Sequence, residues 1–179
     1  MITRIKTRLS RFRKEDAGAL YTVEFAVMLP LLFMALAFGV ELTTHANRQF
    51  QVDRALDVTT RTIQLNTGAN YSHADVKSYL CQKSGGLKDC ESNMMLEMTP
   101  INPRDFTGLP AMPACVDRSA PVNPIRGWSV GQQHELMMLR ACYSFEPVFG
   151  SFGLGALLGT DDAGMGRMVA ISAFVQEPR

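Results

Sequence analysis

A single carboxylate, Glu24, interrupts an otherwise uncharged apolar run. The segment from Ala17 to Val40 contains no other charged side chain. A charge at the centre of a bilayer costs about 3 kcal/mol or more, and snorkelling or protonation near the end of a span reduces that cost. Taken alone, Glu24 is therefore either an acid tolerated at the membrane interface or a group whose charge a partner compensates.

The apolar run is long enough to cross a membrane, and the flanking charges indicate its direction. About 20 apolar residues span a hydrocarbon core of roughly 30 Å. The first fourteen residues contain six of the eighteen Lys and Arg residues and no acid. The positive-inside rule then predicts a cytoplasmic basic leader over residues 1–18, a transmembrane helix over 19–42 and export of the remainder.

A cleaved secretory signal peptide is the alternative interpretation of this N-terminus. The small-x-small triplet Ala35-Leu36-Ala37 follows an apolar core, as it does before many cleavage sites. Glu24 within the run and Pro30 in its middle count against cleavage. The helical pattern also continues past Ala37 without a break, which favours a retained anchor.

The helical pattern extends well beyond the apolar run. Residues spaced alternately three and four apart form one narrow, half-apolar stripe: Leu42, His45, Gln49, Val52, Leu56, Thr59 and Ile63. Asn66-Thr67-Gly68 then gives a stop signal. We predict one helix from about Leu20 to Asn66, roughly 70 Å long, whose exported part over 43–66 rests on a small domain over 67–179.

The exported domain is predicted to be a small α+β unit. Residues 70–81 are predicted to contain a short helix, with Ser72 as its N-cap and Asp75 positioned for a capping box. Strands are expected over 93–101, 135–148 and 166–176, a long loop over 100–134 and a small helix over 152–158. The predicted architecture is therefore a long N-terminal helix beside a three-stranded antiparallel sheet.

All four cysteines lie beyond the apolar run, where an oxidising compartment would favour two disulfides. Four cysteines allow three pairings. Cys81 and Cys90 bracket Gly85-Gly86 and favour a local bridge, which leaves Cys115 to pair with Cys142. A zinc site is the alternative, but the spacing contains no CxxC pair and no histidine lies close in sequence.

The remaining residues give little sign of catalysis. From Thr43 to the C-terminus, twelve basic and thirteen acidic residues nearly balance, so the globular part lacks the charge of a nucleic-acid-binding face. The three histidines are far apart in sequence and are expected on surfaces or helix faces. We expect no enzymatic activity, no metal, no cofactor and no nucleic-acid partner.

The N-terminal segment resembles a known family. A basic stretch, the acidic pair Glu15-Asp16, Gly18, Val23-Glu24-Phe25-Ala26 and Leu29-Pro30 follow one another in the order found in TadE-like minor pseudopilins of the tight-adherence pilus. The Cys81…Cys90 pair and the closing segment from Ala173 to Pro178 also resemble these chains. The resemblance implies a pilin-like fold in the inner membrane, with the N-terminus cytoplasmic and the C-terminal domain periplasmic.

The resemblance also implies partners and residue roles. A prepilin peptidase would cut on the cytoplasmic side within Gly18, Ala19 and Leu20, and other pseudopilins, pilin subunits and an inner-membrane assembly platform would be the partners. Glu24, Phe25 and Pro30 would act in assembly, with the Glu24 carboxylate facing the N-terminal amine of a neighbouring subunit in the lipid bilayer.

One spacing departs from the family pattern. Glu24 is the sixth residue after Gly18, whereas the family usually has a fifth-position glutamate. Three explanations of this spacing remain open. The peptidase cuts after Ala19, the spacing is relaxed in this chain, or no cleavage occurs. Two functions follow: a minor pseudopilin that primes or organises a tight-adherence pilus, or a permanently anchored single-pass scaffold or binding protein of an envelope secretion machine.

Overall fold

The computed structural model describes residues 16–66, 68–104, 112–118, 120, 123–150, 154–157 and 163–178, with only the backbone described at 16–20, 156 and 157. Residues 1–15 of the expected basic leader lie outside this set. The chain divides into two compact units between Val40 and Glu41. This division assigns the expected exported helix segment over 43–66 to the same unit as the C-terminal domain.

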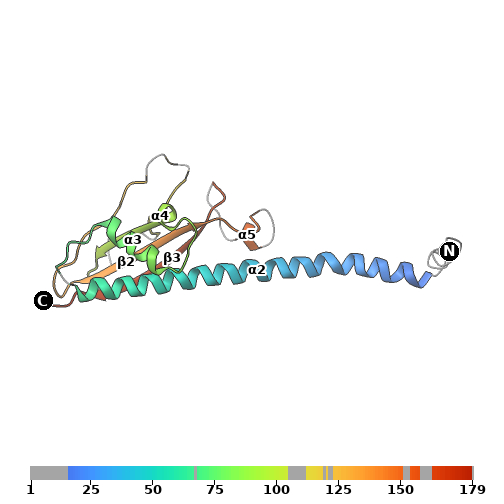
Figure 1. Ribbon diagram of the computed structural model, residues 1–179, viewed down its shortest axis with the longest axis horizontal. Coiled ribbons are helices and arrows are strands. Elements are labelled where there is room, and N and C mark those ends of the chain that lie inside the picture. The colour runs from blue at the N-terminus through green and yellow to red at the C-terminus, as the bar shows by residue number, and fades with distance from the viewer. Residues whose placement is uncertain are drawn as a thin grey trace. The chain divides into compact units, whose positions relative to one another are not determined.

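One helix, α2, runs from Asp16 to Leu65 and belongs to both units (Figure 1). It ends at the stop signal expected from the sequence, where the amide of Asn66 donates to the carbonyl of Ile63 at 3.3 Å and Gly68 has a φ of 85°. Only part of the predicted stripe is buried, because Leu42 is 60% exposed while Glu41 beside it is 1% exposed. The expectation for Leu42 was therefore wrong.

The second unit is an α+β fold, as the sequence predicted. After α2 come α3 (His73–Lys83), α4 (Cys90–Asn93), β1 (Met94–Pro100), β2 (Leu136–Phe145), α5 (Leu154–Leu157) and β3 (Gly166–Val175). Ser72 caps α3 through the predicted capping box with Asp75. The small helix α4 was not predicted, and it begins after Asp89, whose φ is 50°.

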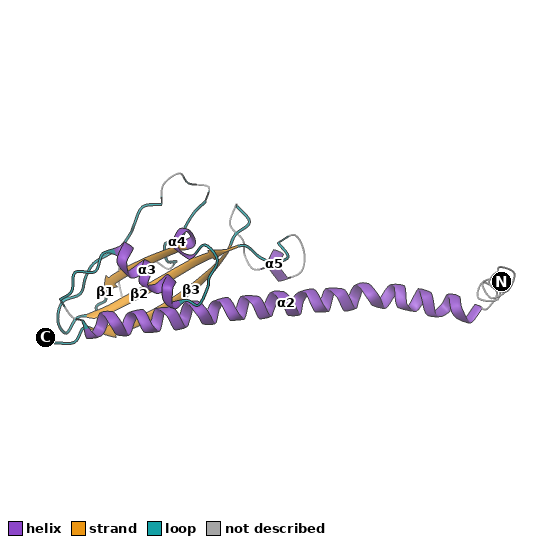
Figure 2. Cartoon of the chain, viewed as in Figure 1, coloured by secondary structure: helices purple, strands orange, loops and turns teal. Residues whose placement is uncertain are grey.

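The three strands form an antiparallel sheet in the order β1-β2-β3 (Figure 2). Leu96, Ala141 and Ala170 are in register across it. This face of the sheet and helices α2 and α3 contribute side chains to one apolar core, which includes Val52, Leu56, Ile63, Val76, Leu80, Leu96, Met98, Leu139, Met168 and Phe174.

The opposite face of the sheet is covered over β1 and β2 but not over β3. Met95 and Glu97 point away from the core yet are buried, so β1 is enclosed on both sides instead of showing one solvent-facing side. The covering segment belongs to the long loop, since Ala114 and Val116 hydrogen-bond to side chains of β1 and β2. On β3, buried and exposed residues alternate almost throughout.

Leu56 tests whether the exported part of α2 is an integral part of the core. Its side chain is almost completely buried, whereas Leu65 on the same helix is exposed. We expect Leu56→Ala to lower the free energy of unfolding by about 2–5 kcal/mol through lost burial and a cavity. Leu65→Ala is the matched control and should change it by less than about 0.5 kcal/mol. Denaturant unfolding in detergent measures both, and equal effects would contradict this packing.

Candidate assembly site

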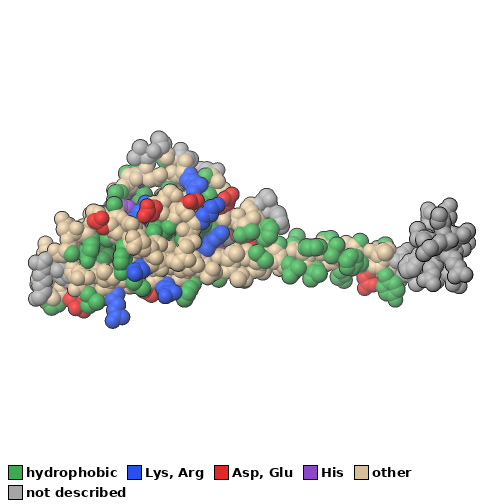
Figure 3. Space-filling view, in the orientation of Figure 1, with side chains coloured by type: hydrophobic (Ala, Val, Ile, Leu, Met, Phe, Trp, Pro, Cys, Tyr) green, Lys and Arg blue, Asp and Glu red, His purple; other side chains and the backbone are tan. Residues whose placement is uncertain are grey.

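The first unit presents Glu24 on a helix that is apolar on all sides. Its most apolar window has a mean hydropathy of 2.2, and none of that window is buried inside the structure. Large apolar side chains around the helix are exposed, among them Val23, Phe25, Val27, Met28, Leu31, Leu32, Phe33, Met34 and Leu36 (Figure 3). A helix that is apolar all round requires an apolar environment, which a membrane or the packed helices of partners provide.

The residues that the sequence analysis assigned to assembly lie on this helix. Glu24, Phe25 and Pro30 are all exposed, and Pro30 lies inside α2. Proline has no N–H, so the carbonyl of Ala26 loses its usual helical hydrogen-bond donor. The processing window of Gly18, Ala19 and Leu20 falls in the first turns of α2, and its side chains lie outside the described residues.

A second carboxylate, Glu41, lies at the first position after the apolar run and has a different environment. Its side chain is buried and accepts two backbone hydrogen bonds, one on each oxygen. The amide of Val148 donates to Oε1 at 3.2 Å, and the amide of Phe149 donates to Oε2 at 2.9 Å. Glu41 therefore fastens the segment after β2 to the start of the exported half of α2.

Neighbouring side chains of α2 extend this attachment along the helix. The ring of His45 meets the ring of Phe145 edge to face, with centroids 5.6 Å apart. Two turns after Glu41, Arg48 donates to the carbonyl of Glu146 at 3.2 Å, and its guanidinium lies 5.2 Å from the centre of the Phe145 ring. Together with the two hydrogen bonds to Glu41, these three contacts hold the C-terminal end of β2 and the segment after it against one face of α2.

The four cysteines form the two pairs that the sequence favoured. Cys81 is bonded to Cys90 and Cys115 to Cys142. The first bridge joins α3 to α4 across Gly85 and Gly86, whose φ values of 74° and 106° suit glycine. The second bridge fixes the covering loop segment to the centre of β2.

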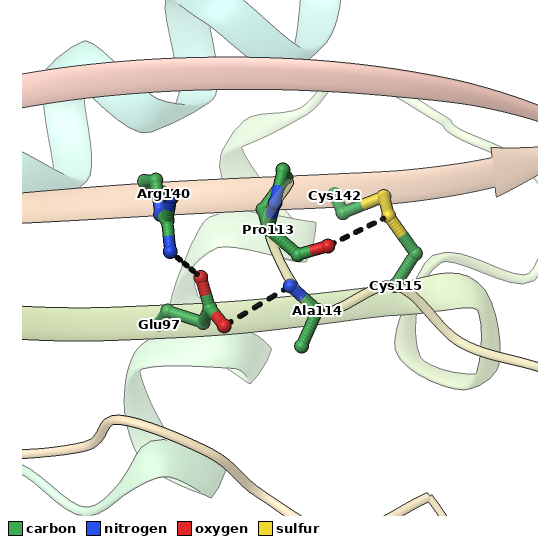
Figure 4. Close-up of polar contacts among 6 residues, drawn as sticks. All are labelled: Glu97, Pro113, Ala114, Cys115, Arg140 and Cys142. Atoms are coloured by element: carbon green, nitrogen blue, oxygen red, sulfur yellow. Dashed lines mark hydrogen bonds and ion pairs between the residues drawn. A yellow bond between two sulfur atoms is a disulfide. The ribbon is translucent and has the colours of Figure 1, made fainter. Parts of the chain in front are cut away.

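A buried ion pair lies beside the second disulfide (Figure 4). On neighbouring strands, Arg140 Nη2 and Glu97 Oε2 are 2.5 Å apart, and both side chains are about 6% exposed. Glu97 Oε1 also accepts from the amide of Ala114 at 3.0 Å. The ion pair and this hydrogen bond compensate a carboxylate that would otherwise be costly to bury. The hydrogen bond also holds the loop segment that contains Ala114 against β1.

The histidines do not meet at one site. His45 contacts Phe145, His73 contacts Trp128 edge to face, and His134 is exposed with a φ of 64°. Burial lowers the pKa of His73, and the charge of nearby Lys77 lowers it further. Within the described part of the chain, no cluster of three or more His, Cys, Asp or Glu side chains is arranged to hold a metal ion.

Sequence reasoning missed Glu41, the buried acid with the clearest structural role. The spacing of the stripe pointed to Leu42, and the distant backbone amides that bind Glu41 leave no local pattern. A usable signal did exist, because Glu41 is the first charged residue after the uncharged stretch from Phe25 to Val40. A carboxylate at the end of an apolar run marks a place where the environment of a helix changes.

Comparisons with protein-family models, with curated proteins and with solved structures found no match.

Glu41→Ala tests the attachment at the start of the exported helix. The substitution leaves the amides of Val148 and Phe149 without their acceptor, and we expect a loss of about 1–3 kcal/mol in the free energy of unfolding. Limited proteolysis should also cut more rapidly near residues 146–150. Glu146→Ala removes an exposed carboxylate from the same segment and serves as the control. If both variants behaved like wild type, Glu41 would have no anchoring role.

Proposed function

We propose that this protein is a minor pseudopilin of a tight-adherence pilus, anchored in the inner membrane by α2. The observation that carries the proposal is Glu24, the one carboxylate of the apolar stretch of α2 from Ala17 to Val40, where large apolar side chains are exposed. The same helix continues into a small disulfide-bonded α+β unit. The residues around Glu24 that resemble TadE-like chains support the assignment to this class.

Glu24 acts in assembly through charge compensation. In lipid, a carboxylate and an ammonium group each offset the other's desolvation when they are in contact. Cleavage within Gly18–Leu20 by a prepilin peptidase would expose a new N-terminal amine close to the level of Glu24 in the membrane. A neighbouring subunit would then pair its amine with Glu24 while the apolar surfaces of the helices pack together.

The membrane topology follows from the charges on either side of the apolar helix. The basic leader stays in the cytoplasm, the helix crosses the inner membrane once, and the unit that begins at Glu41 lies in the periplasm. An oxidising compartment is also where two disulfides form and persist. Partners are other pseudopilins and pilin subunits, together with the assembly platform.

Reporter fusions test this topology. An alkaline phosphatase fused after Arg179 should be active, because the enzyme needs an oxidising compartment, while the same fusion after Lys14 should be inactive. Non-reducing peptide mapping of membrane protein should recover Cys81 with Cys90 and Cys115 with Cys142. Phosphatase activity only in the Lys14 fusion, or four free thiols, would contradict both the topology and the export of the domain.

Glu24→Ala tests the role in assembly. The substitution makes the span more apolar, so membrane insertion should be retained. The neighbour's amine would lose its compensating charge, and we expect surface pili to fall by about tenfold or more, the effect of 1.4 kcal/mol at each contact. Membrane abundance, N-terminal sequencing and electron microscopy of pili provide the measurements.

Two further variants distinguish the possible causes of a loss of pili in Glu24→Ala. Glu24→Gln separates charge from hydrogen bonding, because an amide still forms hydrogen bonds but carries no charge. Val27→Ala, one turn along the same helix, controls for a general effect of trimming the span. Normal piliation in Glu24→Ala, or an unprocessed N-terminus with normal function, would instead favour the permanently anchored scaffold.

A further inference from the structure

A pocket of about 340 Å³ lies within the second unit, among α2, the turn before α4 and the segment after β2. The buried part of its lining consists of Asn93, Tyr143, Phe145, Pro147 and Met165. A water molecule occupies about 30 Å³ in the liquid, so this space is larger than a single water or a bare ion needs. The pocket therefore has room for a small organic group.

Three cationic side chains from separate parts of the chain line this pocket. Arg48 belongs to α2, Lys88 to the turn before α4 and Arg118 to the loop segment that covers β1 and β2. Arg48 is half-buried, while Lys88 and Arg118 are exposed. The three residues are far apart in sequence, so only the fold brings their charges to one pocket.

Neutral groups hold the two arginines in place. Arg118 Nη2 donates to Oδ1 of the buried Asn93 side chain at 2.6 Å. Arg48 donates to the carbonyl of Glu146, and its guanidinium lies over the ring of Phe145. Because a guanidinium has five N–H groups, each arginine keeps further donors for a ligand.

Two acids, Asp89 and Glu146, also line the pocket. Among the described residues, neither acid forms an ion pair with any of the three cations. The ammonium group of Lys88 likewise has no hydrogen-bond partner in the described part of the chain. With three cations and two acids, the lining keeps an excess of one positive charge.

Charges from different segments act on the hydroxyl of buried Tyr143. This hydroxyl donates to the backbone carbonyl of Lys88 at 2.8 Å, which joins β2 to the turn before α4. Burial raises the pKa of Tyr143, the charges of Arg48 and Arg118 oppose that rise, and the charge of Asp89 adds to it. These side chains are thus close enough for their charges to interact across one pocket.

We propose that this pocket binds a phosphodiester, a phosphate group with one negative charge and organic substituents. Phosphate oxygens accept hydrogen bonds from several directions, which suits donors on three segments, whereas one guanidinium can match the two oxygens of a carboxylate. The single negative charge balances the excess positive charge of the lining. Phe145, Pro147 and Met165 give the organic part of the ligand an apolar floor.

Phosphodiesters occur in phospholipid headgroups and in soluble esters, and a calorimetric titration separates these sources. The full-length protein is used in an uncharged maltoside detergent. One probe is glycerophosphoglycerol, a soluble phosphodiester, and the other is phosphatidylglycerol in mixed micelles, which carries the same headgroup on lipid chains. We expect wild type to bind. Binding of the soluble probe identifies the phosphodiester itself as sufficient, whereas binding of the lipid alone assigns the ligand to the membrane.

Three variants test which charges bind the ligand. Lys88→Gln removes a cation that makes no side-chain hydrogen bond, so it should weaken binding by about tenfold or more and leave the unfolding midpoint unchanged. Arg54→Gln is the matched control, because it removes an exposed cation of α2 outside the pocket and should bind like wild type. Asp89→Asn removes a competing negative charge and should tighten binding, and asparagine tolerates the φ of 50° at this position.

Three results would overturn the proposal. The first is that wild type binds neither probe. The second is equal weakening by Lys88→Gln and Arg54→Gln, which would show a general attraction between charges. The third is equal affinity for a triglutamate peptide, which would assign the pocket to the carboxylates of a protein partner. All of the variants change residues of the second unit, and none of the measurements depends on Glu24 or on pilus formation.

Discussion

The helix α2 has an apolar, exposed first part and a second part that packs in a protein core. The rest of the structure depends on the boundary between these parts at Val40 and Glu41. From Tyr21 to Val40, α2 is apolar apart from Glu24 and a few uncharged polar residues, and most of its side chains are exposed. From Glu41 onward, one face of the helix forms part of a protein core. This change falls within one helix, and side chains of that helix make it.

Glu41 makes that change through its two backbone acceptor bonds. A carboxylate at this position gives the segment after β2 a fixed attachment where the apolar surface of the helix ends. His45 and Arg48 continue the attachment along α2, so the C-terminal end of β2 is held by polar and aromatic contacts as well as by burial. In the proposed topology, Glu41, His45 and Arg48 are among the first residues of the exported unit after the membrane-spanning segment.

The sheet achieves burial in different ways on its two faces. Helices α2 and α3 cover one face with apolar side chains, and a single loop segment covers half of the other through a disulfide and an ion pair. This arrangement leaves apolar side chains exposed on the outer face of β3, namely Val169, Ile171 and Val175. A small domain with three strands has few ways to cover every surface.

The sequence by itself determined the features that depend on local pattern. The continuous apolar run specified the exposed helix of the first unit, the Ser72–Asp75 spacing specified the start of α3, and residue periodicity gave three strands near their observed places. The cysteine spacing also favoured the pairing found, since a loop containing Gly85 and Gly86 brings Cys81 and Cys90 together.

Only the tertiary structure decided which groups meet across long separations. Helical spacing favoured Leu42 as a buried residue, but the amides of Val148 and Phe149 made Glu41 the buried one. The pattern of β1 did not reveal that a distant loop covers its second face, or that the segment around Trp128 pairs with its outer edge at Met98. Periodicity reports which side of an element is apolar, whereas burial of a charge and closure of an edge depend on hydrogen-bond partners that only the folded chain brings into place.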